Sequence, residues 1–286
     1  MIVFSGTKST ALAWEVSKQL KCPAGKTDIR KFPDGEIYVR VETEVAGKEC
    51  AVIQSTRSSD DFMEIIFLMD ALRDAGATQI HLMAPYLGYM RQDKVFKEGE
   101  ALSAKTILKT LHELADSIST INCHFLNSGG ETVFNSVNFM NLDAIPTIVD
   151  YMRKDLKNPV VIAPDKGSLT YAKAASEMLG CQFNHLEKTR ISGEEVSVED
   201  KKLNVNKKDV LMIDDIISTG GTIIEASKII RKYRPASINV ACVHGLFLSG
   251  VKQFQGVVDR IVSTNTIESP ISKISVARII ADDLRR

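Results

Sequence analysis

The segment from Val210 to Tyr233 constrains the fold more than any other part of the chain. Four apolar residues, Val210 to Ile213, are followed by two acids and then by a turn rich in glycine and hydroxyl groups. From Thr222 to Tyr233 the apolar residues recur at helical spacing, which predicts a helix. A buried strand that leads through a tight turn into a helix is typical of the βα units of parallel sheets.

Apolar runs and helical segments alternate along the whole chain, in two series. The first series predicts strands near 2–4, 36–41, 51–53, 80–84 and 118–123 and helices near 9–20, 60–75 and 103–115. The second predicts strands near 160–163, 182–186, 210–213 and 238–243 and helices near 145–156, 169–179, 222–233 and 275–284. We therefore expect an α/β fold of two domains, 1–142 and 143–286, each a mostly parallel sheet flanked by helices. The last helix can pack on the first domain.

The turn after the strand at 210–213 has the chemistry of a sugar-phosphate site. Free N–H groups at a helix N-terminus attract anions, glycines allow a phosphate to approach the backbone, and hydroxyls add donors. Adjacent carboxylates suit the hydroxyls of a sugar, or a metal ion. The candidate residues are Asp214, Asp215, Ser218, Thr219, Gly220, Gly221 and Thr222. The alternative is an ordinary strand-to-helix turn, but such a turn needs neither two acids nor three hydroxyls. The Gly-Lys-Ser/Thr ending of a P-loop is missing.

Other polar clusters also follow predicted strands or turns, where ligands of open α/β sheets bind. Phe32 to Glu36 is a Pro-Asp-Gly turn, Tyr89 to Lys94 combines Arg91 and Gln92 with acid and amine groups, and His124 directly follows a strand. Asp165 starts another strand–acid–glycine–hydroxyl turn, and Lys188 and Arg190 alternate in a charged segment where they can converge on one anion. Each has a structural alternative: a turn, a solvated loop, a satisfied histidine, a helix cap at Ser168 and a charged hairpin, respectively.

Composition limits the classes of partner. Lys plus Arg and Asp plus Glu number 36 each, so a net charge of zero gives no electrostatic argument for nucleic acid or membrane binding. The five cysteines are scattered and unpaired in pattern, which favours reduced thiols in a cytoplasmic protein. No signal peptide or membrane-spanning apolar run is recognisable.

Taken in order, these motifs resemble the ribose-phosphate pyrophosphokinases (PRPP synthetases). The motifs are Phe-Pro-Asp-Gly-Glu at 32–36, Tyr-x-Arg-Gln-Asp at 89–93, His124, Pro-Asp-x-Gly at 164–167, Glu-Lys-x-Arg at 187–190 and Asp-Asp-x-x-Ser-Thr-Gly-Gly-Thr at 214–222. The resemblance implies two phosphoribosyltransferase-like domains. It also implies transfer of the diphosphoryl group of Mg·ATP to the C1 hydroxyl of ribose 5-phosphate, giving PRPP and AMP. Family members work as homo-oligomers, here expected to be a dimer or a multiple of it.

By the same resemblance, ATP would contact Phe32, Asp34, Glu36, Arg91 and Gln92, with Phe32 stacking on adenine. His124 and Asp165 would be Mg²⁺ ligands, and Lys188 and Arg190, on a mobile loop, would stabilise the transferring phosphates. Arg190, Asp214, Asp215 and the residues from Ser218 to Thr222 would hold ribose 5-phosphate.

Three positions depart from the family pattern, and the mildest is Ser168, which stands in place of the second glycine of an Asp-x-Gly-Gly form. Asn122 stands where many members have Asp, and Ser218 stands where many have an acid. These departures leave room for a non-catalytic regulatory homologue. A plain phosphoribosyltransferase is a further alternative, although it would explain only the turn at 214–222.

Overall fold

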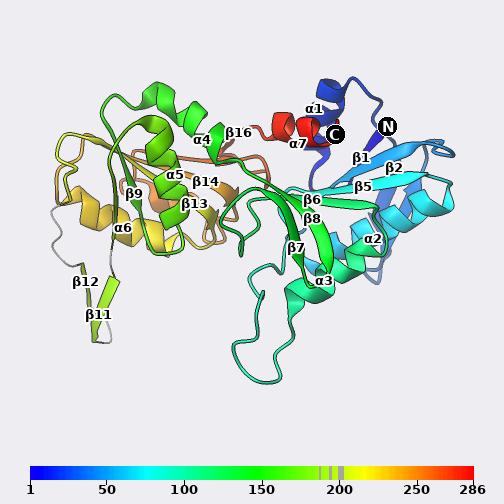
Figure 1. Cartoon of the computed structure of the whole chain (residues 1–286), viewed down its shortest axis with the longest axis horizontal. Coiled ribbons are helices and arrows are strands. Elements are labelled where there is room, and N and C mark those ends of the chain that lie inside the picture. The colour runs from blue at the N-terminus through cyan, green and yellow to red at the C-terminus, as the bar shows by residue number, and fades with distance from the viewer. Residues whose placement is uncertain (187, 193–194, 199–202) are drawn as a thin grey trace. The chain divides into compact units, whose positions relative to one another are not determined.

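The structure is a computed structural model. It describes the backbone of residues 1–186, 188–192, 195–198 and 203–286, and the side chains of all residues outside 187–202. The chain divides into two compact units (Figure 1). Unit 1 comprises residues 1–143, 266–268 and 275–286, and unit 2 comprises 144–265 and 269–274. The final helix therefore belongs to unit 1. No helix in the described parts is long and apolar enough to cross a membrane.

Unit 1 is built on a six-stranded sheet that is parallel apart from one edge strand. Its strands, in spatial order, are β1 (Ile2–Ser5), β4 (Glu49–Ile53), β5 (Gln79–Ala84), β6 (Ser117–Ile121), β8 (Val137–Leu142) and β7 (Gly130–Phe134), and only β7 pairs antiparallel. The helices are α1 (Thr10–Leu20), α2 (Ser59–Asp74), α3 (Ser103–His112) and α7 (Ala277–Asp283). A separate antiparallel hairpin joins β2 (Thr27–Lys31) to β3 (Ile37–Val41).

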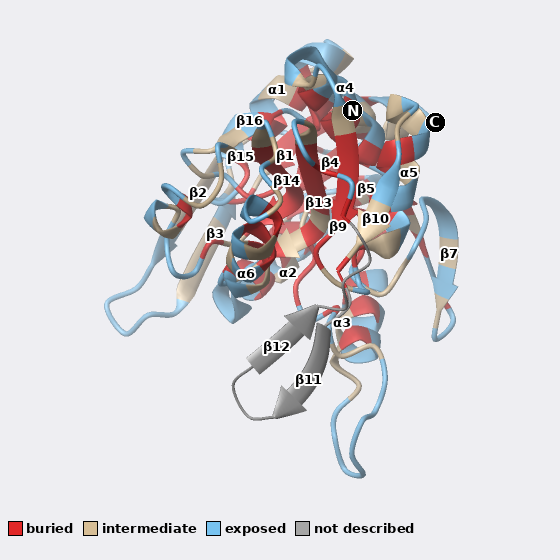
Figure 2. Cartoon of the chain, turned by 90° about the vertical axis from the view of Figure 1, so that its left-hand side faces the viewer, coloured by how far each residue is buried: buried red, intermediate tan, exposed pale blue. Residues whose placement is uncertain are grey.

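The core of unit 1 follows from the helical and strand periods. On α2, Phe62, Ile65, Met69 and Leu72 recur at three- and four-residue spacing and are buried. They pack in one cluster with the central strands, which Figure 2 shows as a buried layer. Helix α2 begins with a capping box in which Ser58 Oγ accepts from Asp61 N and the Asp61 carboxylate accepts from Ser58 N.

Unit 2 has a fully parallel six-stranded sheet. Its strands, in spatial order, are β10 (Phe183–His185), β9 (Pro159–Ala163), β13 (Asp209–Ile217), β14 (Ser237–Gly245), β15 (Arg260–Thr264) and β16 (Ser272–Ile274). The helical segments are α4 (Ile145–Met152), η1 (Arg153–Asp155), α5 (Leu169–Leu179), α6 (Gly221–Arg231) and η2 (Lys252–Phe254). The backbone of β11 (Lys188–Ser192) and β12 (Glu195–Val198) forms an antiparallel hairpin. The α/β class with two mostly parallel sheets is confirmed.

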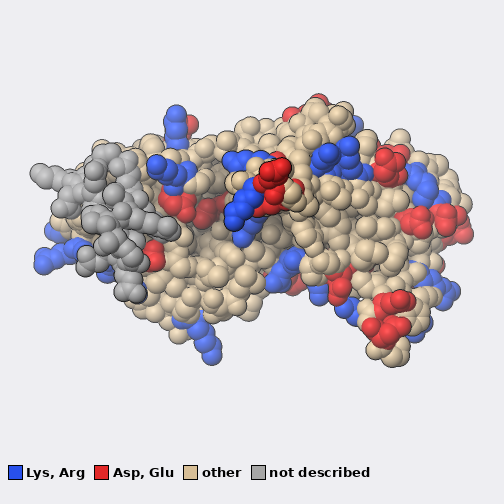
Figure 3. Space-filling view, turned by 90° about the horizontal axis from the view of Figure 1, so that it is seen from below, with Lys and Arg blue, Asp and Glu red and all other residues tan. Residues whose placement is uncertain are grey.

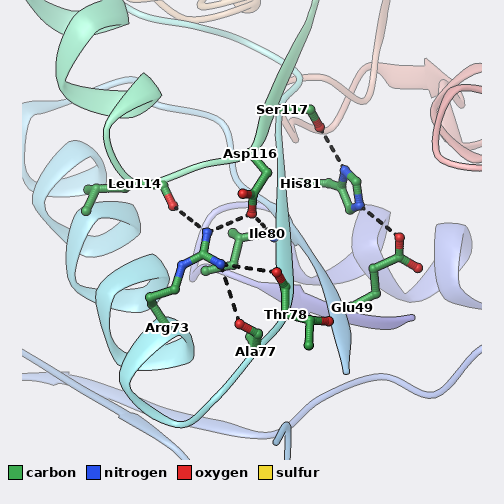
Figure 4. A network of polar contacts seen from close by, with 9 residues as sticks. All are labelled: Glu49, Arg73, Ala77, Thr78, Ile80, His81, Leu114, Asp116 and Ser117. Atoms are coloured by element: carbon green, nitrogen blue, oxygen red, sulfur yellow. Dashed lines mark hydrogen bonds and ion pairs between the residues drawn. The ribbon is translucent and has the colours of Figure 1, made fainter. Parts of the chain in front are cut away.

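The two units repeat one arrangement of strands. Strands β1, β4, β5 and β6 are four successive parallel neighbours in chain order in unit 1, and β9, β13, β14 and β15 form the same kind of run in unit 2. Each unit also contains the same polar clasp at the amino end of its sheet. Asp116 Oδ2 accepts from Arg73 and from Ile80 N, both at 2.7 Å (Figure 4), and Asp259 Oδ2 accepts from Arg231 and Ile238 N at 3.0 and 2.6 Å.

Some predicted details were wrong. The helix expected near 60–75 begins one residue earlier, at Ser59, because Ser58 is its N-cap. The strand expected at 118–123 ends at Ile121, because Asn122 turns into the left-handed region with φ +40°. The alternative of a cap at Ser168 holds in position only: Ser168 is the N-cap residue of α5, but its hydroxyl donates to Asp165 O and not to the helix. The strands β2, β7, β8, β15 and β16 were not predicted.

We expect the clasps to stabilise each unit. Burial raises the pKa of Asp116, but the hydrogen bonds from Arg73 and Ile80 N outweigh it, so the pKa is lowered. Asp116→Ala or Asp259→Ala should each reduce the free energy of unfolding by about 1–3 kcal/mol, because a backbone N–H and an Arg lose their acceptor.

The measurement is urea unfolding at neutral pH. As a control, Asp282→Ala removes an exposed partner of Arg285 and should cost less than about 0.5 kcal/mol. For Asp116 the deficit should shrink as the pH falls through its lowered pKa, since the wild-type carboxylate then also loses its charge. A cost equal to that of the control would contradict the clasp.

Candidate active site

The turn that follows β13 is the centre of the candidate site. Parallel pairing with β14 continues to Ile217 opposite Gly245, so Asp214 and Asp215 lie inside the strand and not after it, as the sequence had suggested. The turn proper is Ser218 to Gly220, and α6 begins at Gly221. Among the described residues, no acceptor contacts the backbone N–H groups of residues 219–222. Those groups remain available for an anion at a helix N-terminus.

Gly220 is required by both its backbone and its surroundings. Its φ of +91° lies in a region that side chains disfavour. A Cβ at this position would also lie 2.4 Å from Cζ of Phe254. The close ring explains why this turn position needs glycine.

Three carboxylates converge at the carboxyl ends of β9 and β13. Burial is the main cause that raises the pKa of Asp214 well above its usual value, and the nearby charges of Asp215 and Asp165 raise it further. Asp215 is itself buried, and its backbone N–H donates to Asp214 Oδ1 at 3.0 Å. The structure thus brings Asp165 together with the two acids of β13. A group of like charges is stabilised by a cation or by hydroxyl donors.

Asp165 is the oxygen donor in this group that best suits a magnesium ion. Its Oδ1 accepts from Gly167 N at 3.0 Å and Ser168 N at 3.3 Å, which fixes the carboxylate. Its Oδ2 has no hydrogen-bond partner among the described residues. The described residues contain no cluster of three or more acids, histidines or cysteines arranged for a metal. Mg²⁺ commonly takes only one or two protein carboxylates and completes its shell with phosphate and water, so the donor set fits.

Phe32, Asp34 and Glu36 lie at the exposed tip of the β2–β3 hairpin. Asp34 Oδ1 accepts from Glu36 N at 3.2 Å, and Phe32 N donates to Glu36 O at 2.8 Å, so the tip is an ordered turn. The Phe32 ring meets Tyr38 edge-on with centroids 5.7 Å apart and is 46% exposed. The exposed ring surface can stack on a base.

Arg91 and Gln92 lie in the connection between β5 and α3. Arg91 is exposed, whereas Gln92 Nε2 donates to Glu100 Oε2 at 3.0 Å and to Lys94 O at 3.1 Å. Glu100 also accepts from Phe96 N and Lys97 N, and these two bonds are the main reason that its pKa is lowered. Glu100 therefore ties the connection together. Glu100 was not among the predicted site residues, although an acid at the far end of a long polar loop is a usable signal.

His124 is exposed and lies three residues beyond the end of β6. The departure at Asn122 has a structural explanation, because Asn tolerates φ +40° better than most residues and its Nδ2 donates to Asp143 Oδ1 at 3.0 Å. Cys123 N donates to Asn141 Oδ1 at 2.8 Å, which fixes the backbone next to His124.

Lys188 and Arg190 lie on β11, opposite Val198 and Val196 of β12. Their side chains fall outside the described part of the structure, so their role stays a prediction. The charged hairpin that was the structural alternative is present as backbone.

The corresponding turns of unit 1 are filled by the unit's own side chains. In the β4–α2 turn, Arg57 N and Ser58 N both donate to Asp61 Oδ2 at 2.8 Å. In the β1–α1 turn, Thr7 donates to Glu64 through both its N–H and its hydroxyl. Unit 1 thus binds internal carboxylates where unit 2 leaves N–H groups open.

A cavity of about 970 Å³ in unit 1 lies away from these groups. Its lining includes Glu49, His81 and Ser117, which stand at or near the amino ends of their strands. Ligands of parallel α/β sheets bind at the carboxyl ends. The cavity is therefore not assigned to the candidate site. Over the described part of the face in Figure 3, cationic and acidic side chains are interspersed.

Comparison with known proteins adds the family. Residues 1–114 match the family model described as the N-terminal domain of ribose phosphate pyrophosphokinase, and residues 143–268 match the phosphoribosyl transferase domain. The chain is 41% identical to a ribose-phosphate pyrophosphokinase of Methanothermobacter thermautotrophicus, covering 99% of this chain and 100% of that protein. It is 38% identical to one of Pyrococcus furiosus, covering 96% and 97%.

A solved structure agrees with these relatives. The phosphoribosylpyrophosphate synthetase of Mycobacterium smegmatis superimposes with a TM-score of 0.85 at 25% identity, over 99% of this chain and 97% of that one. The similarity covers both sheets and nearly the full length, and the chain therefore belongs to the ribose-phosphate pyrophosphokinase family.

Proposed function

We propose that this chain transfers the diphosphoryl group of Mg·ATP to the C1 hydroxyl of ribose 5-phosphate, producing PRPP and AMP. The observation that carries the proposal is the open set of N–H groups at 219–222 beside the acids of β13. Donors for a phosphate and acceptors for sugar hydroxyls stand next to each other in the sequence and on one βα unit. Membership of the ribose-phosphate pyrophosphokinases supports the same reaction.

In the proposed step, the C1 oxygen of ribose 5-phosphate forms a bond to the β-phosphorus of ATP. The bond from that phosphorus to the α–β bridging oxygen breaks, and AMP leaves with the electron pair. The C1 hydroxyl loses its proton to solvent or to a basic group. Catalysis of such a transfer rests mainly on positioning and on stabilising phosphate charge.

The acceptor is assigned to unit 2. The turn from Ser218 to Thr222 holds the 5-phosphate with backbone N–H groups and hydroxyls. Asp214 and Asp215 accept hydrogen bonds from the ribose hydroxyls. Arg190 adds a positive charge toward the acceptor's phosphate.

The donor is assigned to groups of unit 1. Phe32 stacks on adenine, while Asp34 and Glu36 accept from the nucleotide's polar hydrogens. Arg91 pairs with phosphate oxygens, for which a guanidinium is well suited. Gln92 completes the contact, held in place by its hydrogen bond to Glu100.

Mg²⁺ is assigned to His124 and Asp165, and it supplies neutralisation of phosphate charge when bound. Lys188 and Arg190 stabilise the charge that develops on the transferring phosphates. The alternative of a non-catalytic regulatory homologue keeps these groups without turnover, and a phosphoribosyltransferase would consume PRPP. We expect a cytoplasmic homo-oligomer, a dimer or a multiple of it, that needs neither nucleic acid nor a membrane.

The assay is direct. Mixing the protein with Mg·ATP and ribose 5-phosphate should yield AMP and PRPP in equal amounts. Both products are measured by chromatography. Absence of AMP would reject the enzyme in favour of the regulatory homologue. Consumption of PRPP with a free base would favour the phosphoribosyltransferase. Calorimetric titration with ATP separates the regulatory homologue from the phosphoribosyltransferase, since the phosphoribosyltransferase needs no ATP site.

Lys188→Ala tests the catalytic cation. Removal of a charge that acts on the transferring phosphates should lower kcat by on the order of 10²–10³-fold, with little change in thermal unfolding. Lys157→Ala serves as a matched control elsewhere in unit 2 and should leave kcat unchanged. Unchanged turnover in Lys188→Ala would assign β11 a purely structural role.

Asp214→Asn should separate function from stability. The raised pKa means that the folded state holds this proton more tightly than the unfolded state does, so folding loses stability as the pH rises from about 4 through the folded pKa. The neutral amide avoids that loss, so the variant should melt a few degrees above wild type at pH 8 and show a smaller difference at pH 4.5.

The same substitution should weaken the binding of ribose 5-phosphate. A carboxylate accepts from hydroxyls with both oxygens, whereas an amide accepts with one oxygen and donates with its nitrogen. A rise in KM for the sugar with a higher melting temperature is the expected pair of results. A lower melting temperature at pH 8 would contradict the account of the acid cluster.

A further inference from the structure

The turn that binds the 5-phosphate in this proposal is braced by one neighbouring segment of unit 2. The connection from β14 to β15 donates to three successive carbonyls, that of Ile217 at the end of β13 and those of Ser218 and Thr219 in the turn. Phe247 N bonds Ile217 O at 3.2 Å, and Leu248 N bonds Ser218 O at 2.9 Å. The third bond comes from a side chain: Gln253 Nε2 donates to Thr219 O at 2.6 Å.

These bonds decide where the N–H groups point. In a planar trans peptide the C=O and the following N–H point in opposite directions. A carbonyl held by the brace therefore turns the next N–H away from it. The bond to Ser218 O orients the N–H of Thr219, and the bond to Thr219 O orients the N–H of Gly220, which are two of the donors left open for an anion.

Gln253 is suited to this task by its amide. Its nitrogen carries two hydrogens, and the second bonds Gly250 O at 3.0 Å. The side chain is thus anchored to its own segment while it holds the turn. A carboxylate in its place has no hydrogen to donate and would face two carbonyl oxygens.

The next residue, Phe254, packs against the same turn at Gly220. Phe254 is buried, meets Phe247 edge-on at 5.9 Å, and lies where a Cβ of residue 220 would stand. The turn therefore rests on the Phe254 ring and is aligned by the Gln253 amide. The other two bonds come from backbone N–H groups, so Gln253 is the member of the brace that a substitution can remove without altering the main chain.

We propose that Gln253 is a positioning residue for ribose 5-phosphate: it orients the peptide between Thr219 and Gly220 so that its N–H meets the 5-phosphate. This inference rests on the proposed function of the turn. Gln253 acts through the backbone and makes no contact with the reacting atoms. Its loss should therefore affect the phosphorylated acceptor and leave the nucleotide untouched.

The test compares Gln253→Leu and Gln253→Glu with Gln255→Leu. Gln255 is an exposed glutamine two residues away whose described hydrogen bond is a backbone one, to Lys252 O. Loss of one aligned hydrogen bond should raise KM for ribose 5-phosphate about 3–10-fold in Gln253→Leu, and more in Gln253→Glu, at unchanged KM for ATP. Gln255→Leu should match wild type in both constants.

A second readout separates alignment from general loosening of the unit. Ribose without the 5-phosphate should bind and react equally with Gln253→Leu and with wild type, because the altered peptide no longer has a phosphate to meet. Equal losses for ribose and ribose 5-phosphate, a raised KM for ATP, or an unchanged KM for ribose 5-phosphate would each overturn the inference.

The inference can fail without the proposed function. If wild type makes PRPP and Gln253→Leu keeps its affinity for ribose 5-phosphate, only the role of Gln253 is lost. If wild type makes no PRPP, calorimetric titration of ribose 5-phosphate still decides the matter. Weaker binding by Gln253→Leu supports the alignment, and equal binding overturns it.

Discussion

Crowding of like charge around Asp214 is the constraint on which the site depends. Burial and the charges of Asp215 and Asp165 all oppose ionisation of this carboxyl group. Folding keeps the three acids together because parallel pairing of β9, β13 and β14 brings their carboxyl ends to one edge. Such an arrangement costs stability in the free protein and is relieved by bound hydroxyls or a cation. The proposed function places groups of both kinds, ribose hydroxyls and a magnesium ion, at this edge.

The two units show how a repeated architecture acquires different tasks. Both have the same order of central strands and the same Arg–Asp clasp at the amino end. At the carboxyl end they differ. In unit 1, Asp61 and Glu64 accept hydrogen bonds from the backbone N–H groups of the turns, whereas the turn of unit 2 leaves its N–H groups open. An internal carboxylate and a phosphate satisfy the same donors. This difference supports placing the sugar phosphate on unit 2.

Much of the fold was predictable, because buried parallel strands are short apolar runs and α2 has a strong helical period. The candidate residues of the 214–222 turn could also be found from their chemistry. The extension of β13 through the acids could not, since only pairing with β14 carries polar residues into a strand. Gln253 could not be predicted either, because it donates to a backbone carbonyl 34 residues away and an isolated Gln carries no local pattern. Glu100 differs, since its partners lie within eight residues of it in one long polar loop.

In each unit the clasp lies at the amino ends of the strands, held by Arg73 and Asp116 in unit 1 and by Arg231 and Asp259 in unit 2. The proposed chemistry of unit 2 lies at the carboxyl ends of its strands. Substitutions at the amino ends of the strands can therefore adjust thermal stability to a warmer or colder habitat without changing the residues at the carboxyl ends. Selection for robustness and selection for catalytic rate then need not compete for the same positions.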